Sequence, residues 1–231
     1  MTSNTEHVEL MKKPEWYSDA QKYWNAVPAT VDGMLGGFET IDPIDVKGSI
    51  SFIKEFVDQN IISTEYACDC GAGIGRVTKN FLLQVPFKRV DLVEQAESFV
   101  QQAKSEYLAQ EIEQGKVGNV FCQGLQGFTP EEGKYDLIWC QWVLGHLTDE
   151  HFVNFFKRCI KGLKPNGFIG VKENNASKEA LFDDEDSSVT RPNQALKRLF
   201  AEAGLTIVKE EVQKGFPAGL FAVRMYLLKP Q

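Results

Sequence analysis

The sequence predicts an α/β fold with a mostly parallel sheet, a C-terminal antiparallel hairpin, helices on both faces and an N-terminal helical cap. The first observation is a series of short apolar runs with the profile of strands, at residues 66–70, 89–93, 118–122, 135–140 and 167–172. Helix-like segments separate these runs, and such alternation is typical of βαβ units, whose strands pair in parallel. The second observation is that two strand-like runs follow each other at the end, at 205–212 and 222–228. Their connection is too short for a crossover helix, which predicts a hairpin.

The helical segments can be justified in the same way. Residues 1–60 contain no strand-like run and are expected to form helices joined by a glycine-rich turn at 32–37, as a cap on the sheet. Residues 98–113 and 149–163 place apolar side chains three and four positions apart, as amphipathic helices do. No repeat or linker is visible, so we expect residues 1–231 to form a single domain.

Composition excludes several classes of protein. Hydrophobic residues make up 43% and charged residues 25% of the 231 residues, as in ordinary globular proteins. No apolar run approaches the roughly 20 residues of a membrane helix, and the first residues do not resemble a signal peptide. We therefore expect a soluble cytoplasmic protein, with the nucleus as a second location and no membrane partner.

Charge and cysteine content narrow the class further. The net charge of −7 argues against nonspecific binding to nucleic acid, which depends on Lys and Arg. Five cysteines without a CxxC pair and three histidines predict reduced thiols and no metal site.

The most informative segment is residues 68–76, which follows one strand and precedes a helix at 77–83. It places glycines at 71, 73 and 75, with Asp69 two residues before the first. Such glycines allow a tight turn and a close approach of the backbone to a ligand. Glu94, at the end of the next strand, is where an acid can accept hydrogen bonds from two ribose hydroxyls. The alternatives are an ordinary strand-to-helix turn for the loop and a solvated strand end for Glu94.

Two ligands suit such a loop, a nicotinamide dinucleotide and S-adenosylmethionine (SAM). A pyrophosphate needs unhindered amides at a helix N-terminus. SAM carries a carboxylate instead, and Arg76 directly after the last glycine could pair with it. We therefore favour SAM.

Residues 69–76, together with Glu94 and the turn at 163–167, resemble the seven-stranded class of SAM-dependent methyltransferases, whose Rossmann-like sheet ends in an antiparallel hairpin. Four further segments resemble the protein N-terminal methyltransferases, at residues 30–37, 138–147, 171–175 and 183–191. The resemblance runs from about residue 23 to the end of the chain. Enzymes of this family methylate the α-amine of proteins that begin Xaa-Pro-Lys or Xaa-Pro-Arg after loss of the initiator methionine, with S-adenosylhomocysteine as product. The resemblance implies such N-terminal segments as partners, ribosomal proteins among them.

The resemblance also implies roles for individual residues. The cofactor would contact Gly71, Arg76, Glu94, Gln95, Ala96, Leu125, Gln126 and Gln141. The catalytic group would comprise Asp186 as the base, His146 as a second candidate base and Asn174 as the holder of the amine. The substrate peptide would contact Tyr23, Trp24, Leu35, Gly36, Trp142, Asp183, Ser188 and Phe221.

The chain departs from the family at two positions, with Phe221 near a common tyrosine and Glu173 at a common aspartate. Other interpretations also stay open. The acidic run at 183–186 could be a solvated loop, His146 could cap the helix that follows it, and Tyr23 and Trp24 could be the buried face of a capping helix. Trp139 and Trp142 are three residues apart on a strand and so face opposite sides, which leaves one of them free for substrate. The rival functions are methylation of a small metabolite and an inactive SAM-fold binding subunit.

Overall fold

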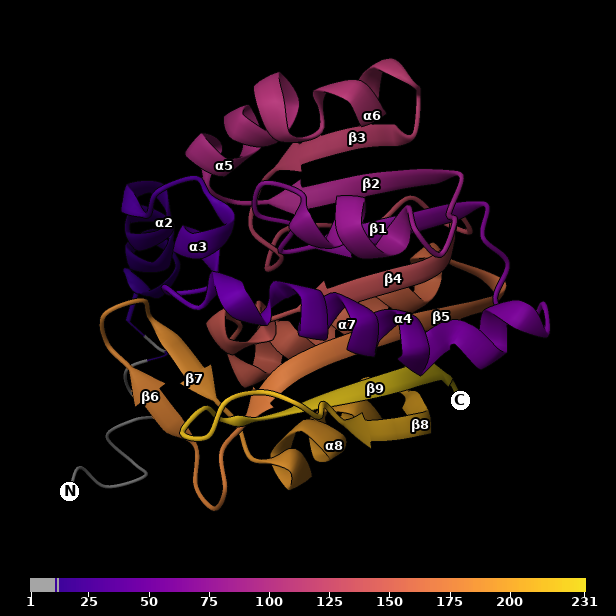
Figure 1. The fold of residues 1–231 in the computed structure, drawn as a ribbon. Coiled ribbons are helices and arrows are strands. Elements are labelled where there is room, and N and C mark those ends of the chain that lie inside the picture. The colour runs from indigo at the N-terminus through magenta and orange to yellow at the C-terminus, as the bar shows by residue number, and fades with distance from the viewer. Residues whose placement is uncertain (1–10, 12) are drawn as a thin grey trace.

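The computed structural model describes residues 11 and 13–231, which build a seven-stranded sheet in the order β3-β2-β1-β4-β5-β9-β8 (Figure 1). The strands β1 to β5 are parallel, whereas β9 is antiparallel to both β5 and β8. The strand bounds are β1 (Tyr66–Cys70), β2 (Arg89–Glu94), β3 (Val117–Cys122), β4 (Tyr135–Gln141), β5 (Leu163–Asn175), β8 (Leu205–Val212) and β9 (Ala222–Pro230). The predicted fold class is confirmed. The sequence did not reveal that the last strand inserts between β5 and β8.

The helices within the described residues are α2 (Trp16–Ala26), α3 (Val31–Met34), α4 (Asp42–Asp58), α5 (Glu97–Gln102), α6 (Ala109–Glu113), α7 (Asp149–Gly162) and α8 (Asn193–Glu202). The expected helix at 149–163 is α7. The expected single helix at 98–113 is instead divided, because a wide π-helical turn at Ala103–Tyr107 separates α5 from α6. A similar turn, Thr78–Leu82, follows the glycine loop.

Helices cover both faces of the sheet. On one face α7 and α8 contribute an aromatic cluster that includes Phe152, Phe156 and Phe200. On the other face Phe52 and Ile53 of α4 pack in a second core cluster against the strands. The expectation that residues 1–60 form only a cap is therefore wrong for α4, which runs across the front of the sheet as one of its covering layers (Figure 1).

The true cap is smaller and gathers at the carboxyl ends of the parallel strands. It consists of α2, α3 and a short hairpin of β6 (Leu181–Asp183) and β7 (Ser188–Thr190), which lie together in Figure 1. The indole of Trp16 in α2 donates a hydrogen bond to the carbonyl of His146, 2.7 Å away, which ties the cap to the sheet. Ligands of open α/β sheets bind outside this edge. Among the described residues no helix has the length and apolar character needed to cross a membrane.

Candidate active site

Two adjoining cavities lie at this edge of the sheet. The glycine-loop cavity has about 840 Å³ of empty space, and the acidic-turn cavity about 1410 Å³, part of each open to solvent. Both are lined by a shared set of residues: Trp24, Met34, Leu35, Trp142 and His146. A ligand in one cavity would therefore lie next to a ligand in the other.

The backbone of the glycine loop has a conformation that residues other than glycine rarely adopt. The φ angles of Gly71, Gly73 and Gly75 are +75°, +56° and +92°. A Cβ at position 71 would also lie 2.4 Å from Cβ of Val143, and one at position 73 would lie 2.1 Å from Sδ of Met34. The glycines are thus needed for the loop's own packing as well as for access of a ligand.

Glu94 is buried, so its interpretation as a solvated strand end is wrong. Its Oε2 accepts the N–H of Gly73 at 2.9 Å, and its Oε1 accepts the N–H of Ala96 at 2.8 Å. Burial raises the pKa of this carboxyl, and the backbone hydrogen bonds oppose the rise. A carboxylate has about four acceptor positions, which leaves capacity for hydroxyl groups of a ligand. Ala96, in contrast, is fully buried beside Phe99 and does not line the cavity.

Arg76 and Gln141 line the same cavity, and aspartates that do not line it bind their side chains. Arg76 is 4% exposed, and its Nη1 forms ion pairs with Asp42 at 2.6 Å and Asp45 at 2.8 Å. The side-chain amide of Gln141 also donates to Asp45. The sequence reasoning missed both aspartates, because nothing in the pattern of α4 distinguishes them from other polar positions.

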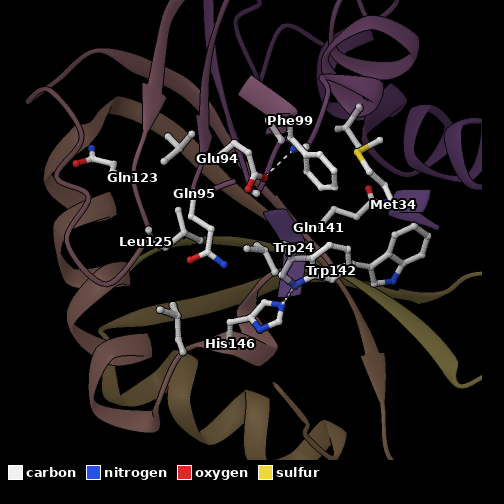
Figure 2. Close-up of a pocket in the computed structure, with 18 of the residues that line it drawn as sticks. Trp24, Met34, Glu94, Gln95, Phe99, Gln123, Leu125, Gln141, Trp142 and His146 are labelled. Carbon is white, nitrogen blue, oxygen red and sulfur yellow. Dashed lines mark hydrogen bonds between the residues drawn. The ribbon is translucent and has the colours of Figure 1, made fainter. Parts of the chain in front are cut away.

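The opposite wall of the cavity follows β2 and β3. Gln95, Leu125 and Gln126 line it, as the resemblance implied, and Phe99 adds an aromatic face. Figure 2 shows Gln95 and Leu125 across the cavity from Gln141 and Trp142, with Glu94 and His146 at its other two sides. Arg158 donates to the carbonyls of Leu125 and Gln126 and so fixes this loop.

These residues fit SAM by their chemistry. The glycine turn admits a close ligand, and the carboxylate of Glu94 suits ribose hydroxyls. The apolar wall suits an adenine ring, and the guanidinium of Arg76 suits a carboxylate. The lining therefore provides partners for the ribose, the adenine ring and the carboxylate of the cofactor.

The acidic-turn cavity contains an unpaired carboxylate oxygen. Oδ1 of Asp186 is buried and has no hydrogen-bond partner among the described residues. Burial raises the pKa of Asp186. Asn174, Asp183 and Ser188 line the same cavity, and the β6–β7 register places Asp183 opposite Ser188. The interpretation of residues 183–186 as a solvated loop is therefore wrong for Asp186.

His146 is fixed by two hydrogen bonds. Its Nε2 lies 3.1 Å from the indole Nε1 of Trp24, and its Nδ1 lies 3.1 Å from the carbonyl of Ser187. An indole N–H can only donate, so Nε2 accepts, and Nδ1 carries the proton that is donated to Ser187. Burial lowers the pKa of the ring, and the charge of Asp186 opposes this effect. Because its one lone pair is engaged, His146 is a weaker candidate for the base than Asp186. It also does not cap α7, whose N-terminal cap is Thr148.

Trp142 directly follows β4 and has a φ of +51°, a left-handed conformation that is rare in residues other than glycine. Its indole Nε1 is buried without a partner among the described residues. Trp139, in contrast, is fully buried and donates to Oε1 of Gln141. Of Trp139 and Trp142, only Trp142 is thus available to a ligand in these cavities. The left-handed turn, rather than strand alternation alone, directs it there.

A carboxylate and a guanidinium hold the turn that carries Trp142 and His146. Oε1 of Glu173 accepts the N–H groups of Val143 and Leu144, both at 2.8 Å. Arg191 donates to the carbonyls of Leu144 and Leu147. Burial raises the pKa of Glu173 to about 7. These supporting roles were missed, because they depend on contacts between distant segments.

The remaining residues implied for the peptide are mostly present in the acidic-turn cavity. Leu35, Gly36 and Phe221 line it. Tyr23 does not. Its ring packs edge-on against Trp24 with centroids 5.3 Å apart, and burial together with the charges of the acidic turn raises the pKa of its phenol.

Comparison with known proteins shows the family to which this chain belongs. A family model described as AdoMet dependent proline di-methyltransferase matches residues 12–229. N-terminal Xaa-Pro-Lys N-methyltransferase 1 of Xenopus tropicalis is 48% identical over 229 residues, covering 98% of this chain and all of that protein. Alpha N-terminal protein methyltransferase 1 of Dictyostelium discoideum is 48% identical over 219 residues, covering 93% of this chain and 80% of that protein.

A solved structure agrees with the sequence comparisons. A SAM-dependent methyltransferase from Leishmania major matches with a TM-score of 0.86 at 43% identity, covering 95% of this chain and 86% of that one. The chain therefore belongs to the AdoMet dependent proline di-methyltransferase family and is a SAM-dependent methyltransferase.

Proposed function

We propose that this enzyme transfers methyl groups from SAM to the α-amine of proteins that begin Xaa-Pro-Lys or Xaa-Pro-Arg. The names of its relatives from Xenopus tropicalis and Dictyostelium discoideum support a protein N-terminus as substrate. The structural observation that carries the proposal is the buried, unpaired Oδ1 of Asp186 in the acidic-turn cavity, which adjoins the glycine-loop cavity. A buried acceptor without a donor is costly, and the N–H groups of an amine would satisfy it.

An α-amine is a suitable nucleophile for this site. Its pKa lies near 7.7–8.0, so roughly 10–20% of it is neutral at pH 7, whereas a lysine amine is almost fully protonated. Bound SAM supplies a methyl group on a positively charged sulfur. The neutral amine nitrogen would accept that methyl group, and the sulfur would leave as the thioether of S-adenosylhomocysteine. Asp186 takes the proton from the amine, and its raised pKa makes it a better acceptor than an exposed aspartate.

Other groups of the cavity position the peptide. Asn174 offers a carbonyl oxygen to hold the amine, and the unpaired indole N–H of Trp142 offers a donor for a peptide carbonyl. Asp183 and Ser188 line the same cavity and suit the cation at the third position. Leu35 and Phe221 add apolar surface suited to proline. The chain's ribosomal targets, and its cytoplasmic and nuclear locations, stay predictions.

A peptide assay tests the proposal. The enzyme is incubated with SAM and a Ser-Pro-Lys peptide, and the product is located by fragmentation in a mass spectrometer. We expect methyl groups on the α-nitrogen only. The matched control is the same peptide with an acetylated N-terminus, which keeps the lysine amine and should not react. Methylation of the lysine, or SAM binding without any product, would contradict the proposal.

A further inference from the structure

Asp45 lies behind the glycine-loop cavity, on α4, and is 1% exposed. It does not line either cavity. Its carboxylate nevertheless contacts three side chains from three other segments. Oδ2 accepts from Arg76 and from Gln141, both at 2.8 Å, and Oδ1 accepts from Gln141 at 3.0 Å and from Lys172 at 2.5 Å.

These contacts determine which atom Gln141 presents to the cavity. The carboxylate of Asp45 can only accept, so the amide nitrogen of Gln141 must face it. The indole of Trp139 can only donate, so the amide oxygen must face that group, 3.0 Å away. The amide oxygen accepts one hydrogen bond from Trp139 and keeps a second lone pair. One lone pair of the amide oxygen of Gln141 therefore stays available to a ligand.

The contacts also determine which N–H donors of Arg76 stay free for a ligand. Among the described residues its bonds to carboxylates all involve Nη1, which pairs with Asp42 and Asp45. The other donors of the guanidinium, on Nε and Nη2, stay available for a ligand. Without a buried counter-ion, a guanidinium that is 4% exposed would be strongly destabilising. Asp45 thus holds the cation beside the cavity without consuming all its donors.

We propose that Asp45 is the positioning residue for the amino-acid part of SAM. That part carries a carboxylate and an ammonium group. Arg76 presents donors for the carboxylate, and Gln141 presents an acceptor for the ammonium, as Asp45 orients both side chains. The proposal rests on the cofactor contacts expected of Arg76 and Gln141, and it does not depend on the identity of the methylated substrate.

Lys172 completes the charge balance of this buried group. Two carboxylates, of Asp42 and Asp45, face the two cations of Arg76 and Lys172. Lys172 is fully buried and also donates to Ser49. Its ammonium pairs with Oδ1 of Asp45, while Arg76 pairs with Oδ2. The two cations favour the ionised carboxylate and hold the pKa of Asp45 below its usual range, although burial acts to raise it.

The alternative is that Asp45 only joins α4 to the sheet. The two roles differ in which ligands they affect. S-adenosylhomocysteine contains the amino-acid part, whereas 5′-methylthioadenosine has the same adenosine and thioether without it. A general loss of structure would weaken both ligands alike, but loss of positioning would weaken S-adenosylhomocysteine selectively.

The test measures both dissociation constants by calorimetry for the wild type and for Asp45→Asn. An asparagine amide must direct N–H groups at one of the three donors, so it cannot replace the carboxylate. We expect the preference for S-adenosylhomocysteine over 5′-methylthioadenosine to fall by roughly 10–100-fold, the range for losing hydrogen bonds to charged groups. An unchanged preference would overturn the proposal, whatever the effect on methyl transfer to a peptide.

Asp91→Asn is the matched control. Asp91 is equally buried and is bonded to Tyr66, Tyr135 and Lys134, away from both cavities. The Asp91→Asn variant should have a lower free energy of unfolding than the wild type and the same preference for S-adenosylhomocysteine over 5′-methylthioadenosine. If Asp45→Asn alone does not fold, the double variant Asp45→Asn with Lys172→Met removes one charge of each sign, which avoids an unpaired buried cation. The same fall in preference is expected there, and an unchanged preference would again overturn the proposal.

Discussion

Two buried polar atoms without partners, Oδ1 of Asp186 and Nε1 of Trp142, give the acidic-turn cavity one acceptor and one donor. A peptide N-terminus offers the complementary pair, an amine and a carbonyl. Single residues of this kind could be predicted from the sequence as site members, since their types and positions match a family. Their lack of hydrogen-bond partners could not be predicted, because it depends on how close the neighbouring groups lie in the folded chain.

The indole N–H of Trp142 can be tested by Trp142→Phe. This change removes the donor and keeps an aromatic ring. We expect the KM for a Ser-Pro-Lys peptide to rise by roughly 2–10-fold, as for the loss of one hydrogen bond. Trp139→Phe is the contrasting variant, because its indole is bonded to Gln141 and lines neither cavity, so at saturating SAM it should leave the KM for the peptide unchanged. A KM for Trp142→Phe equal to that of the wild type would show that this N–H does not contact the peptide.

At the scale of elements, the predictable features were those with a local apolar signal. The strands β1 and β8 have the predicted bounds, because β1 ends at the glycine loop and β8 begins directly after Gly204, a turn residue with a φ of +84°. The hairpin β6–β7 was missed, since its strands have three residues each and enclose an acidic turn. In α8 the buried Leu196, Leu199 and Phe200 follow helical spacing, a signal that could have identified this helix.

The turn that carries Trp142 and His146 is held by the buried Glu173, so its stability should depend on pH. Burial raises the pKa of Glu173 to about 7 in the folded state, above the ordinary value of 4.5. Between these two pH values the folded chain keeps a proton that the unfolded chain releases, so this group makes the protein less stable as pH rises. Above pH 7 the folded state bears the full cost of a buried carboxylate.

Glu173→Gln should remove this dependence while keeping an oxygen for the N–H groups of Val143 and Leu144. In urea unfolding, we expect its free energy of unfolding relative to wild type to increase from pH 5 to pH 8 by on the order of 1–3 kcal/mol. Glu113→Gln, at an exposed position, is the control and should show no such trend. A difference that is the same at both pH values would contradict the buried, raised-pKa state of Glu173.

At the scale of the whole molecule, the site is assembled from segments far apart in sequence. Asp45 of α4, Arg76 after β1 and Gln141 of β4 meet behind the glycine-loop cavity. The glycine loop and the acidic run could be predicted as binding elements, because each has a local composition. The buried charge network between them could not, since it follows from how α4 crosses the sheet.

The two cavities separate cofactor binding from chemistry, which gives the central claim a direct test. Asp186 lines only the acidic-turn cavity, so Asp186→Asn should leave the dissociation constant for SAM about unchanged. Asp183→Asn serves as the matched variant in the same turn. It should mainly raise the KM for lysine-containing peptides, because it weakens the contact with the third residue.

The decisive measurement is kcat for Asp186→Asn on a Ser-Pro-Lys peptide at saturating SAM, across a range of pH. We predict a fall of roughly 10²–10⁴-fold at pH 7, the usual contribution of a positioned general base. The remaining activity should rise with pH, as more of the α-amine becomes neutral without help from the enzyme. A near wild-type kcat at pH 7 would contradict the assignment of Asp186 as the group that takes the proton.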